Sequence, residues 1–420
     1  MRSSPHLPNT KNQLDRLDPL VWKITAVAVL GSLMGQVDAT VVNVSLSSLA
    51  VDLHSSLTTI QWVTSGYLLA LALMLPLNGW LVGQLGAKSL YLWCFPIFTL
   101  SSALCGLAWS ANSLIGFRVL QGMSGGLMAP LAQMMIVRAA GRHTARVFGY
   151  AAIPILLGPL LGPVLAGAIL QHASWRWLFL VNVPVGLFGI LLAIRFLPED
   201  RAEARPRDLD VVGFCLLSPG LVLFLYAMDH VSERIGLTAF LVALVLLTVF
   251  IRAATRRGDD ALIDLQLFRG KDFSASVLTQ FTLNGISFAG QMLIPIMRRV
   301  TQRGRLVDGS SRKGMICTYP KIGVLTQRFG IRRVAGSGAF LALAGTLPFL
   351  FLASHGMSLP LLVCTLVVRG MGLSAVGIPS ITSAYASVEK EHLPMATTSL
   401  NIVQRLGGPT LTTLCATFLG

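Results

Sequence analysis

The chain has little charge for its length, and very little of that charge is negative. Only 12% of its 420 residues are charged, with 18 acidic residues against 33 lysines and arginines. A soluble globular domain carries about 25% charged residues. Since 54% of this chain is hydrophobic, the composition excludes an ordinary soluble domain and predicts a polytopic membrane protein.

Cysteine pairs and metal-ligand motifs are also missing. Five of the 6 cysteines fall inside apolar runs, and the sequence has no Cys-x-x-Cys motif and no Cys/His cluster. Free thiols in apolar helices behave as small hydrophobic groups, so we predict neither disulfides nor a metal centre.

The net charge of +15 does not indicate a nucleic-acid partner, because of where the basic residues lie. Most of them are in short loops on alternate sides of the apolar runs, as the positive-inside rule predicts. The loop that holds Arg138, Arg142 and Arg146 is a clear example. We therefore expect membrane lipid around the protein, a cytoplasmic N-terminus and no nucleic acid. The first apolar run, from about Leu20, continues beyond a signal-peptide core and is kept as a helix.

The apolar runs divide the chain into two bundles. We expect a cytoplasmic tail at 1–19, a six-helix bundle at 20–197, a linker with two inserted helices at 198–272 and an incomplete C-terminal bundle at 273–420. A tight turn is predicted at Gly83–Ser89. In all, we expect about 12 or 13 spans.

The pattern of apolar runs breaks after the ninth. Residues 298–314 carry six basic residues where an outside loop and an apolar helix are expected, and only about Met315–Thr326 remains of the tenth span. The last predicted span is still apolar at Gly420, which suggests C-terminal truncation. A local reading-frame slip or a natural lesion is one interpretation, and a translocated basic loop is the other.

Three short motifs recur in order at nearly constant offsets of 244, 248 and 250 residues. The pairs are Gly79–Lys88 with Gly323–Arg332, Gln121-Gly-Met123 with Arg369-Gly-Met371, and Gly158-Pro159 with Gly408-Pro409. A repeated helical unit with a central site is typical of transporters.

Leu30–Ser47 is an apolar helix with an acid in its middle. Asp38 shares a stripe of small residues, while Gln36 and Asn43 lie on a separate polar face. A carboxylate at mid-bilayer costs about 2.5–3.5 kcal/mol on insertion scales, so Asp38 needs neighbouring helices or water. It either faces a pathway or anchors the helix by a hydrogen bond to a neighbour.

Arg118 is the natural partner for this acid, because it lies on a small-residue face of another apolar run. Burial favours a protonated carboxyl group, whereas a nearby guanidinium favours the carboxylate. A pair that separates during transport would therefore bind and release a proton. A purely structural ion pair is the alternative.

Five stretches resemble the major facilitator superfamily, in its fourteen-helix drug:proton antiporter branch. They are VDATVVNV, GWLVGQLGAK, RVLQGMSGGLMAP, GPLLGPVLAG and WRWLFLVNVPVG. The resemblance covers about residues 20 to 420 and is weak at 298–314. It implies an all-α fold of two pseudo-symmetric six-helix bundles with two inserted helices, in the bacterial inner membrane. It implies no cofactor and a proton as the coupling ion.

The resemblance also implies roles for individual residues, beginning with proton coupling by Asp38 and Arg118. Its antiporter motif corresponds to Gly158, Pro159, Gly162, Pro163 and Gly167. Its gating loops correspond to Gly79, Gly86, Lys88, Gly323, Arg328, Gly330 and Arg332. Candidate cavity residues are Gln36, Asn43, Gln61, Trp62, Tyr67, Gln121, Gln133, Asn284 and Gln291. Ordinary helix packing and inter-helix hydrogen bonds are the alternatives for the motif and cavity residues.

The leading hypothesis is a proton-coupled antiporter that exports small hydrophobic or cationic compounds by alternating access, with any periplasmic adaptor left open. The second is a non-transporting remnant of such an exporter, and the third is a facilitator for a native solute such as a siderophore or sugar. Gly122–Gly126 matches the hydrolase pattern G-x-S-x-G, but it lies within an apolar helix. Without a strand–turn–helix to expose the serine, no enzyme is predicted.

Overall fold

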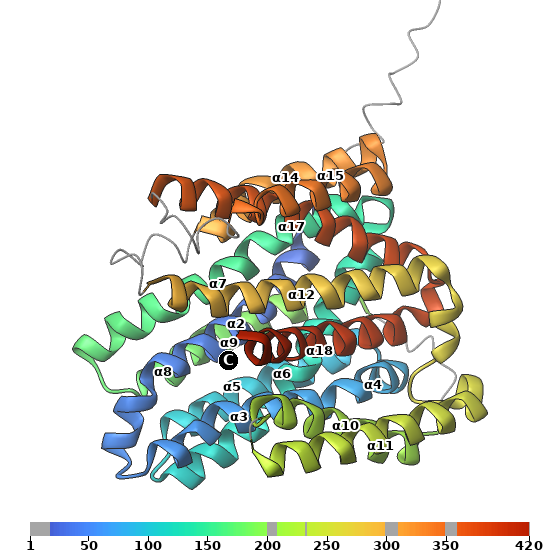
Figure 1. Cartoon of the computed structure of the whole chain (residues 1–420). Coiled ribbons are helices and arrows are strands. Elements are labelled where there is room, and N and C mark those ends of the chain that lie inside the picture. Colours follow the sequence, from blue (N-terminus) through green and yellow to red (C-terminus); the bar gives the residue numbers. More distant parts are fainter. Residues whose placement is uncertain (1–16, 200–207, 232, 299–309, 349–358, 420) are drawn as a thin grey trace, which may run out of the picture.

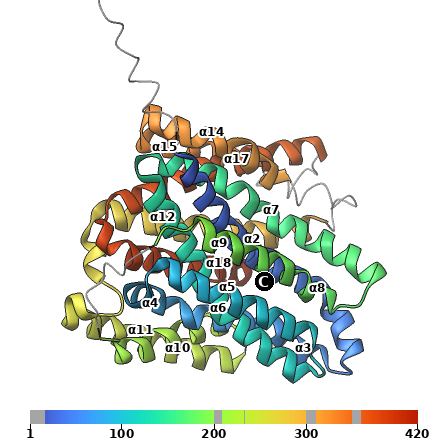
Figure 2. The same ribbon diagram turned by 180° about the vertical axis from the view of Figure 1, so that it is seen from behind.

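The computed structural model describes residues 17–199, 208–231, 233–298, 310–348 and 359–419. These residues form helices joined by short turns, and none of them is in a β-strand. Figures 1 and 2 show the long helices lying side by side in one bundle. The predicted all-α fold is confirmed.

The N-terminal half consists of six helical rods, two of which are interrupted. They are α2 (Pro19–Asp52), α3 (Leu57–Met74) continued by η1 (Leu75–Leu77) and α4 (Asn78–Leu85), α5 (Ala87–Gly106), α6 (Ala111–Ala140), α7 (Thr144–His172), and α8 (Trp177–Leu180) followed by α9 (Asn182–Phe196). The C-terminal half contains α12 (Lys271–Arg298), α14 (Ser310–Phe329), α15 (Ile331–Ala344), α17 (Leu359–Ala386) and α18 (Leu393–Leu419). Between the halves lie α10 (Val211–Asp229) and α11 (Arg234–Arg257).

Several helices are suited to cross a membrane. Among the described residues, eight helical segments are long and apolar enough to span a bilayer, and one of these, Ala111–His172, includes both α6 and α7. Many large apolar side chains on the outside of the bundle are exposed, including Leu191, Ile194 and Val245. Lipid covers such side chains in a membrane protein, so the chain forms a multi-pass membrane bundle.

The helix pairings of the N-terminal half recur in the C-terminal half. In the first half α2 packs on α7, while α3 and α5 both pack on α6. In the second half α12 packs on α18, while α14 and α15 both pack on α17. Across the halves, α14 contacts α7 and α18 contacts α4. The sequence repeat is therefore a repeat in space, and each half offers its second and fifth rods to the other.

The inserted helices α10 and α11 form a hairpin fastened by Asp210. The buried Asp210 carboxylate accepts hydrogen bonds from the backbone N–H of Gly213, at 2.8 Å, and of Leu262, at 3.1 Å. It also pairs with Arg257 at the end of α11. Since α10 packs on both α3 and α18, the hairpin lies along the boundary between the halves.

Two helix boundaries differ from those predicted. The turn expected at Gly83–Ser89 is only Gly86, because α4 continues to Leu85 and α5 begins at Ala87. Gly86 has φ of 78°, a left-handed conformation that favours glycine. Its counterpart Gly330 has φ of 83°, so the repeat extends to this turn.

The helix expected at the tenth apolar run was predicted too short. Helix α14 covers Ser310–Phe329 rather than only Met315–Thr326, and it packs on α7 and α17 in the position that the repeat requires. Arg312 and Lys313 are the third and fourth residues of this helix, within its first turn. Of the disruption predicted at 298–314, residues 299–309 lie outside the described residues, while Arg298 and 310–314 belong to the helices α12 and α14.

Glycines allow α3 and α6 to approach closely. A Cβ atom at Gly122 would lie 2.4 Å from the carbonyl oxygen of Tyr67, and one at Gly126 would lie 2.5 Å from that of Leu71. Real atoms do not approach so closely, so α6 depends on glycine at both positions. By contrast, a Cβ atom at Gly116 on the same helix would meet nothing within 4 Å.

We predict opposite effects of alanine at these two positions of α6. Gly122→Ala must push α3 away from α6, at an overpacking cost of about 1–3 kcal/mol. Gly116→Ala fills open space and gains about 1 kcal/mol of helix propensity. Thermal unfolding of the purified protein in detergent should therefore give a lower Tm for Gly122→Ala and an unchanged or higher Tm for Gly116→Ala. Equal Tm values would contradict the close approach.

Candidate functional site

A buried ion pair joins α2 to α6 inside the N-terminal half. Nη1 of Arg118 lies 2.5 Å from Oδ2 of Asp38, and the two side chains are 0% and 1% exposed. The rarity of an acid within an apolar run is what draws attention to Asp38 in the sequence, and the structure brings it onto the arginine proposed as its partner.

Two side-chain amides complete the surroundings of the Asp38 carboxylate. Its Oδ1 accepts a hydrogen bond from Nδ2 of Asn182 at 2.8 Å and from Nε2 of Gln121 at 3.1 Å. Oε1 of Gln121 in turn accepts from Nη1 of Arg118 at 2.8 Å. The carboxylate is thus held by three donors from two helices, α6 and α9, as a buried charge requires.

The Arg118 guanidinium is held from two further sides. Its Nε donates to the carbonyl oxygen of Val63 on α3 at 3.2 Å. The ring of Tyr67 lies under the guanidinium, with its centroid 4.1 Å from Cζ. Nη2 has no hydrogen-bond partner among the described residues. The arginine is therefore fixed in position, with both N–H bonds of Nη2 left without a partner among the described residues.

Local structure explains how these side chains meet. Arg118 and Gln121 are three residues apart on α6, so they share one face of the helix. Asn182 is the first residue of α9, where the break after α8 turns its side chain inward. Its Nδ2 also lies 3.1 Å from Oγ of Ser102 on α5. The site consequently joins α2, α3, α5, α6 and α9.

Asn182 and Ser102 were not proposed as site residues. Asn182 lies within the stretch WRWLFLVNVPVG that carries part of the family resemblance, and a lone amide in an apolar run was the available signal. Ser102 gave no such signal, because serine is common in apolar helices, where its hydroxyl can donate to a backbone carbonyl of the preceding turn. Only the fold shows that these two residues support Asp38.

The proposed antiporter motif packs against the helix that carries Asp38. A Cβ atom at Gly158 would lie 2.9 Å from Cβ of Gln36, and one at Gly162 would lie 2.9 Å from Cβ of Thr40. Gly167 has open space instead. Pro159 and Pro163 lie inside α7, where each lacks a backbone donor. The glycines thus allow α7 to approach α2 two residues before and two residues after Asp38.

The two halves meet at the end of the bundle that carries Lys88, Arg138 and Arg146, which we call the basic end. Nδ2 of Asn78 donates to Oγ1 of Thr398 at 3.2 Å, and a Cβ atom at Gly79 would lie 3.4 Å from Cγ of Met395. We call these contacts between α4 and α18, with the contacts described next, the seam.

The seam also joins α6 to α17 and α18, and α7 to α14. Oε1 of Gln133 accepts from Tyr385 at 2.8 Å and from Asn401 at 2.9 Å. Gly323 packs against the backbone of Arg146, to which a Cβ atom would come within 2.5 Å. Hydrogen bonds and close packing thus hold the halves together at the basic end, about 22 Å from Arg118 along α6 at 1.5 Å per residue.

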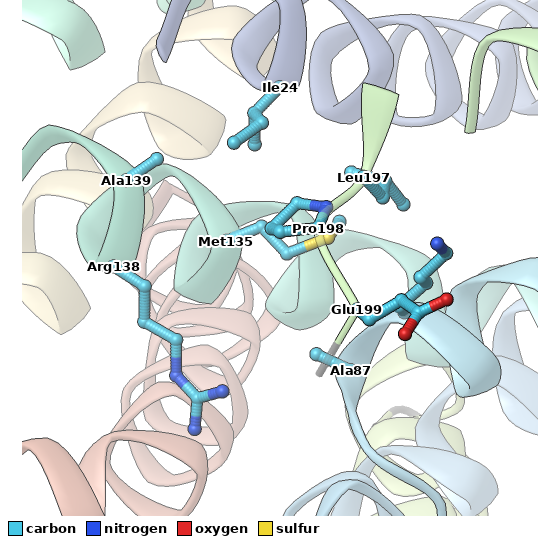
Figure 3. A pocket seen from close by; sticks show the side chains of 9 residues that line it. Ile24, Ala87, Met135, Arg138, Ala139, Leu197, Pro198 and Glu199 are labelled. Atoms are coloured by element: carbon cyan, nitrogen blue, oxygen red, sulfur yellow. The ribbon is translucent and has the colours of Figure 1, made fainter. Parts of the chain in front are cut away.

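The other predicted gating residues lie around this end. Gly86 and Gly330 form the two left-handed turns, and Arg328 and Arg332 are exposed. Lys88 lines a cavity of about 170 Å³ between α2, α5, α6 and the chain after α9. Figure 3 shows this cavity, with Met135 and Pro198 at its centre. It does not include Asp38, so it is separate from the buried pair.

The predicted cavity residues have different positions. Tyr67 and Gln121 contact Arg118, and Gln133 belongs to the seam. Three residues make other contacts: Asn43 accepts from Thr64, Trp62 stacks on Tyr226, and Asn284 lies where α12 meets α18. Gln36 and Gln61 are exposed, and the Gln291 side chain lies outside the described residues. Only Tyr67 and Gln121 therefore reach the ion pair.

We predict that lysine cannot replace Arg118. A single ammonium group cannot contact Asp38, Gln121 and the Val63 carbonyl together, and it loses the planar stack on Tyr67. Arg118→Lys should lower the Tm in detergent by more than Arg176→Lys. Arg176 is half-buried and donates to the carbonyl of Ala108 at 2.8 Å, a contact that lysine can keep. Equal shifts would show that the shape of the guanidinium is unimportant.

We also predict that a disulfide across the seam stops the transport expected from the family resemblance. Gly79 and Met395 are close enough for cysteines at both positions to join, since a Cβ atom at 79 lies 3.5 Å from Cα of Met395. Oxidised Gly79→Cys/Met395→Cys should lose substrate flux, and reductant should restore it. The two single variants, treated with the same oxidant, control for the native cysteines. Full flux in the cross-linked protein would show that the seam stays closed during function.

Comparison with known proteins shows which family this chain resembles. The family model of the Major Facilitator Superfamily matches residues 28–307. A multidrug resistance protein B homolog of Mycobacterium tuberculosis is 32% identical over 418 residues, which cover 96% of this chain and 77% of that protein. A putative multidrug resistance protein MdtD of Salmonella typhi is 32% identical over 374 residues, covering 84% of this chain and 77% of the relative.

A solved structure shares the fold. The proton:xylose symporter XylE, bound to 6-bromo-6-deoxy-D-glucose, aligns with a TM-score of 0.65 over 93% of this chain and 87% of its own. The sequence identity is 15%, so the likeness concerns the arrangement of helices alone.

Proposed function

We propose that this chain, which belongs to the Major Facilitator Superfamily, exports small hydrophobic compounds in exchange for protons. Membership makes it a membrane transporter rather than an enzyme, and relatives named as multidrug resistance proteins support the multidrug class. Proton coupling, the direction of transport and placement in a bacterial inner membrane with a cytoplasmic N-terminus are parts of the proposal.

The observation that carries the proposal is the buried Asp38–Arg118 pair. Among the described residues of the spanning helices, Asp38 is the only carboxylate away from a helix end. A carboxyl group can be neutral or charged, whereas arginine stays protonated. When helix movement separates the pair, Asp38 gains a proton, and when the pair closes again, Arg118 displaces that proton. Each cycle can therefore carry one proton.

Opening and closing of the seam supply the conformational change in this mechanism. With the halves joined at the basic end, the site can open only toward the opposite end, and separation of the seam reverses that access. By the positive-inside rule we assign the basic end to the cytoplasm. A proton that moves inward through the membrane potential supplies about 2.3 kcal/mol per 100 mV. This energy can drive export of a substrate against its gradient.

The packing of α7 on α2 connects the seam to the ion pair. Gly158 and Gly162 allow α7 to pack against α2 on either side of Asp38, while the N-terminal end of α7 contacts α14 across the seam. A shift of α14 relative to α7 is therefore transmitted to the helix that carries Asp38. This is how we propose that opening of the seam changes the spacing of the ion pair.

The substrate class follows from the surroundings of the site. Apolar and aromatic side chains such as Tyr67 and Phe179 surround the ion pair, which favours hydrophobic compounds. The cationic compounds expected from the family resemblance need a free carboxylate, and the Asp38 carboxylate is engaged by Arg118. We therefore limit the proposal to hydrophobic compounds.

We predict that Asp38→Asn abolishes proton-driven efflux. The amide keeps the size of the side chain but cannot exchange a proton, so addition of substrate to energised everted vesicles should no longer dissipate the pH gradient. Nile red, a neutral hydrophobic dye, serves as the substrate. Asp52→Asn removes a carboxylate from the exposed end of the same helix and should retain wild-type flux.

The controls separate the competing hypotheses. Comparable expression and size-exclusion profiles of the two variants show that both have folded. Proton-driven efflux that survives in Asp38→Asn would overturn the role of this residue. Absence of flux in the unmodified chain as well would support the non-transporting remnant, and flux without proton movement would support a facilitator.

A further inference from the structure

A cavity of about 170 Å³ lies at the basic end of the N-terminal half. The helices α2, α5 and α6 line it through Ile24, Ala87 and Met135, and the chain that follows α9 lines it through Leu197 and Pro198. Apolar side chains thus form most of its wall. Since an apolar cavity of about 150 Å³ can hold benzene, this one has room for a compound built on a single ring.

The four helices around this cavity also hold the hydrogen-bond network of Asp38. The members of that network are Asp38 on α2, Ser102 on α5, Gln121 on α6 and Asn182 on α9. On α2, Ile24 lies 14 residues before Asp38, about 21 Å at 1.5 Å per residue, and the cavity is equally far from the network along α5 and α6. A molecule in the cavity would therefore contact every element that positions the Asp38 carboxylate.

Three charged side chains complete the lining of the cavity. Lys88 is the second residue of α5 and is half-buried, whereas Arg138 and Glu199 are exposed. In Figure 3 the Arg138 guanidinium and the Glu199 carboxylate lie on the side of the cavity away from Ile24. The cavity therefore has an apolar interior and a charged mouth.

The balance of charge at this mouth is positive. It has two cations and one acid, and the N-terminus of α5, where Lys88 lies, is the positive end of that helix dipole. Among the described residues, neither Lys88 nor Glu199 has a hydrogen bond or an ion pair. Lys88 is thus a half-buried cation beside an apolar cavity, and its three N–H donors are available to an anion.

We infer that this cavity binds a small anion with an apolar body of about one ring, and that the bound anion restrains transport. A carboxylate, sulfonate or phosphate group would pair with Lys88 and Arg138, while the ring would fill the space beside Met135. Because the ligand would join the four helices that position Asp38, it would oppose the movement that separates the ion pair. The restraint rests on the proposed function, whereas binding itself needs no proton gradient.

Three probes with the same trifluoromethylphenyl body test the binding. The sulfonate is an anion, the methyl sulfone is neutral and the trimethylammonium compound is a cation. Fluorine NMR relaxation of each probe, titrated with the full chain in dodecyl maltoside micelles and corrected with empty micelles, gives its affinity. We expect the sulfonate to bind about fivefold more tightly than the sulfone, and the cation to bind least tightly. Equal affinity for the sulfonate and the cation would overturn the inference.

Variants assign the binding to the cavity. Lys88→Gln should lower the sulfonate affinity about fivefold, the loss of one partly exposed ion pair, and leave that of the sulfone unchanged. Glu199→Gln removes the opposing charge and should raise the sulfonate affinity. Ala139→Phe fills the cavity and should weaken all three probes. Lys271→Gln removes an exposed lysine at the start of α12 and should change none of the affinities.

The outcomes for these variants are decisive in either direction. Unchanged sulfone binding shows that Lys88→Gln has folded, so an unchanged sulfonate affinity in the same variant would overturn the cavity as the binding site. Opposite shifts in Lys88→Gln and Glu199→Gln would support it even where Ala139→Phe does not fold.

Two sources can supply such an anion, and displacement of the sulfonate distinguishes them. Phosphatidylglycerol carries its phosphate on a lipid, whereas phenyl phosphate is a soluble compound with one ring. Displacement by phosphatidylglycerol added to the micelles would identify a membrane lipid as the ligand. Displacement by phenyl phosphate alone would identify a soluble cytoplasmic compound, and displacement by neither would overturn the anion site.

Transport separates this inference from the proposed function. The sulfonate, added to everted vesicles, should inhibit Asp38-dependent efflux of Nile red, and Glu199→Gln should lower the concentration needed. Selective binding with undiminished flux would overturn the restraint. Selective binding in a chain that shows no flux at all would contradict the proposed function alone. Asp38-dependent flux without charge-selective binding would contradict the cavity site alone.

Discussion

The structure depends on a buried pair of charges, of which Asp38 can be neutralised by a proton and Arg118 cannot be neutralised. Arg118 keeps its proton, so it must always face an acceptor, and Asp38, Gln121 and the Val63 carbonyl provide three. Asp38 can be neutral, but its carboxylate is stable only while donors from α6 and α9 point at it. Breaking such a pair costs about 3–5 kcal/mol when one partner is left uncompensated. The five helices around it must therefore stay in register, or move in a way that lets Asp38 take up a proton.

The rod formed by α3, η1 and α4 connects this pair to the seam. Val63 and Tyr67 contact Arg118 from α3, while Asn78 and Gly79 contact α18 from α4. Between them the rod tightens into the 3₁₀ turn η1, which contains Pro76. A short 3₁₀ segment inside a helix often marks a hinge. The same rod can thus hold the ion pair at one end while its other end separates from the second half.

Much of this arrangement is readable from the sequence, for physical reasons. Asp38 and Arg118 are conspicuous because charge is expensive in an apolar run, and the repeat is visible because glycine turns and close helix approaches constrain residue type. Asn182 and Ser102 escaped notice, since helical periodicity gives a face but not the neighbour opposite it. Gln36 and Trp62 illustrate the same limit: both are polar or aromatic residues on plausible faces, yet one is exposed and the other stacks on Tyr226. The true length of α14 was missed because its basic residues lie at the helix end, where charge is tolerated.

The two halves share a backbone plan without sharing a charge plan. Close approach is maintained in both: Gly158 permits contact between α2 and α7, and its counterpart Gly408 permits contact between α12 and α18, where a Cβ atom would lie 3.0 Å from Cδ2 of Phe288. Such contacts depend on residue size alone, so a duplicated fold keeps them whatever the function of each half. Charge is freer to change. Ile286 lies 248 residues after Asp38, and Arg369 lies 248 residues after Gln121. Arg369 still contacts Ile286, so α12 and α17 remain paired although an acid is replaced by an apolar residue and an amide by a cation. The positions where the repeat fails are therefore those where the chemistry of one half has diverged from that of the other.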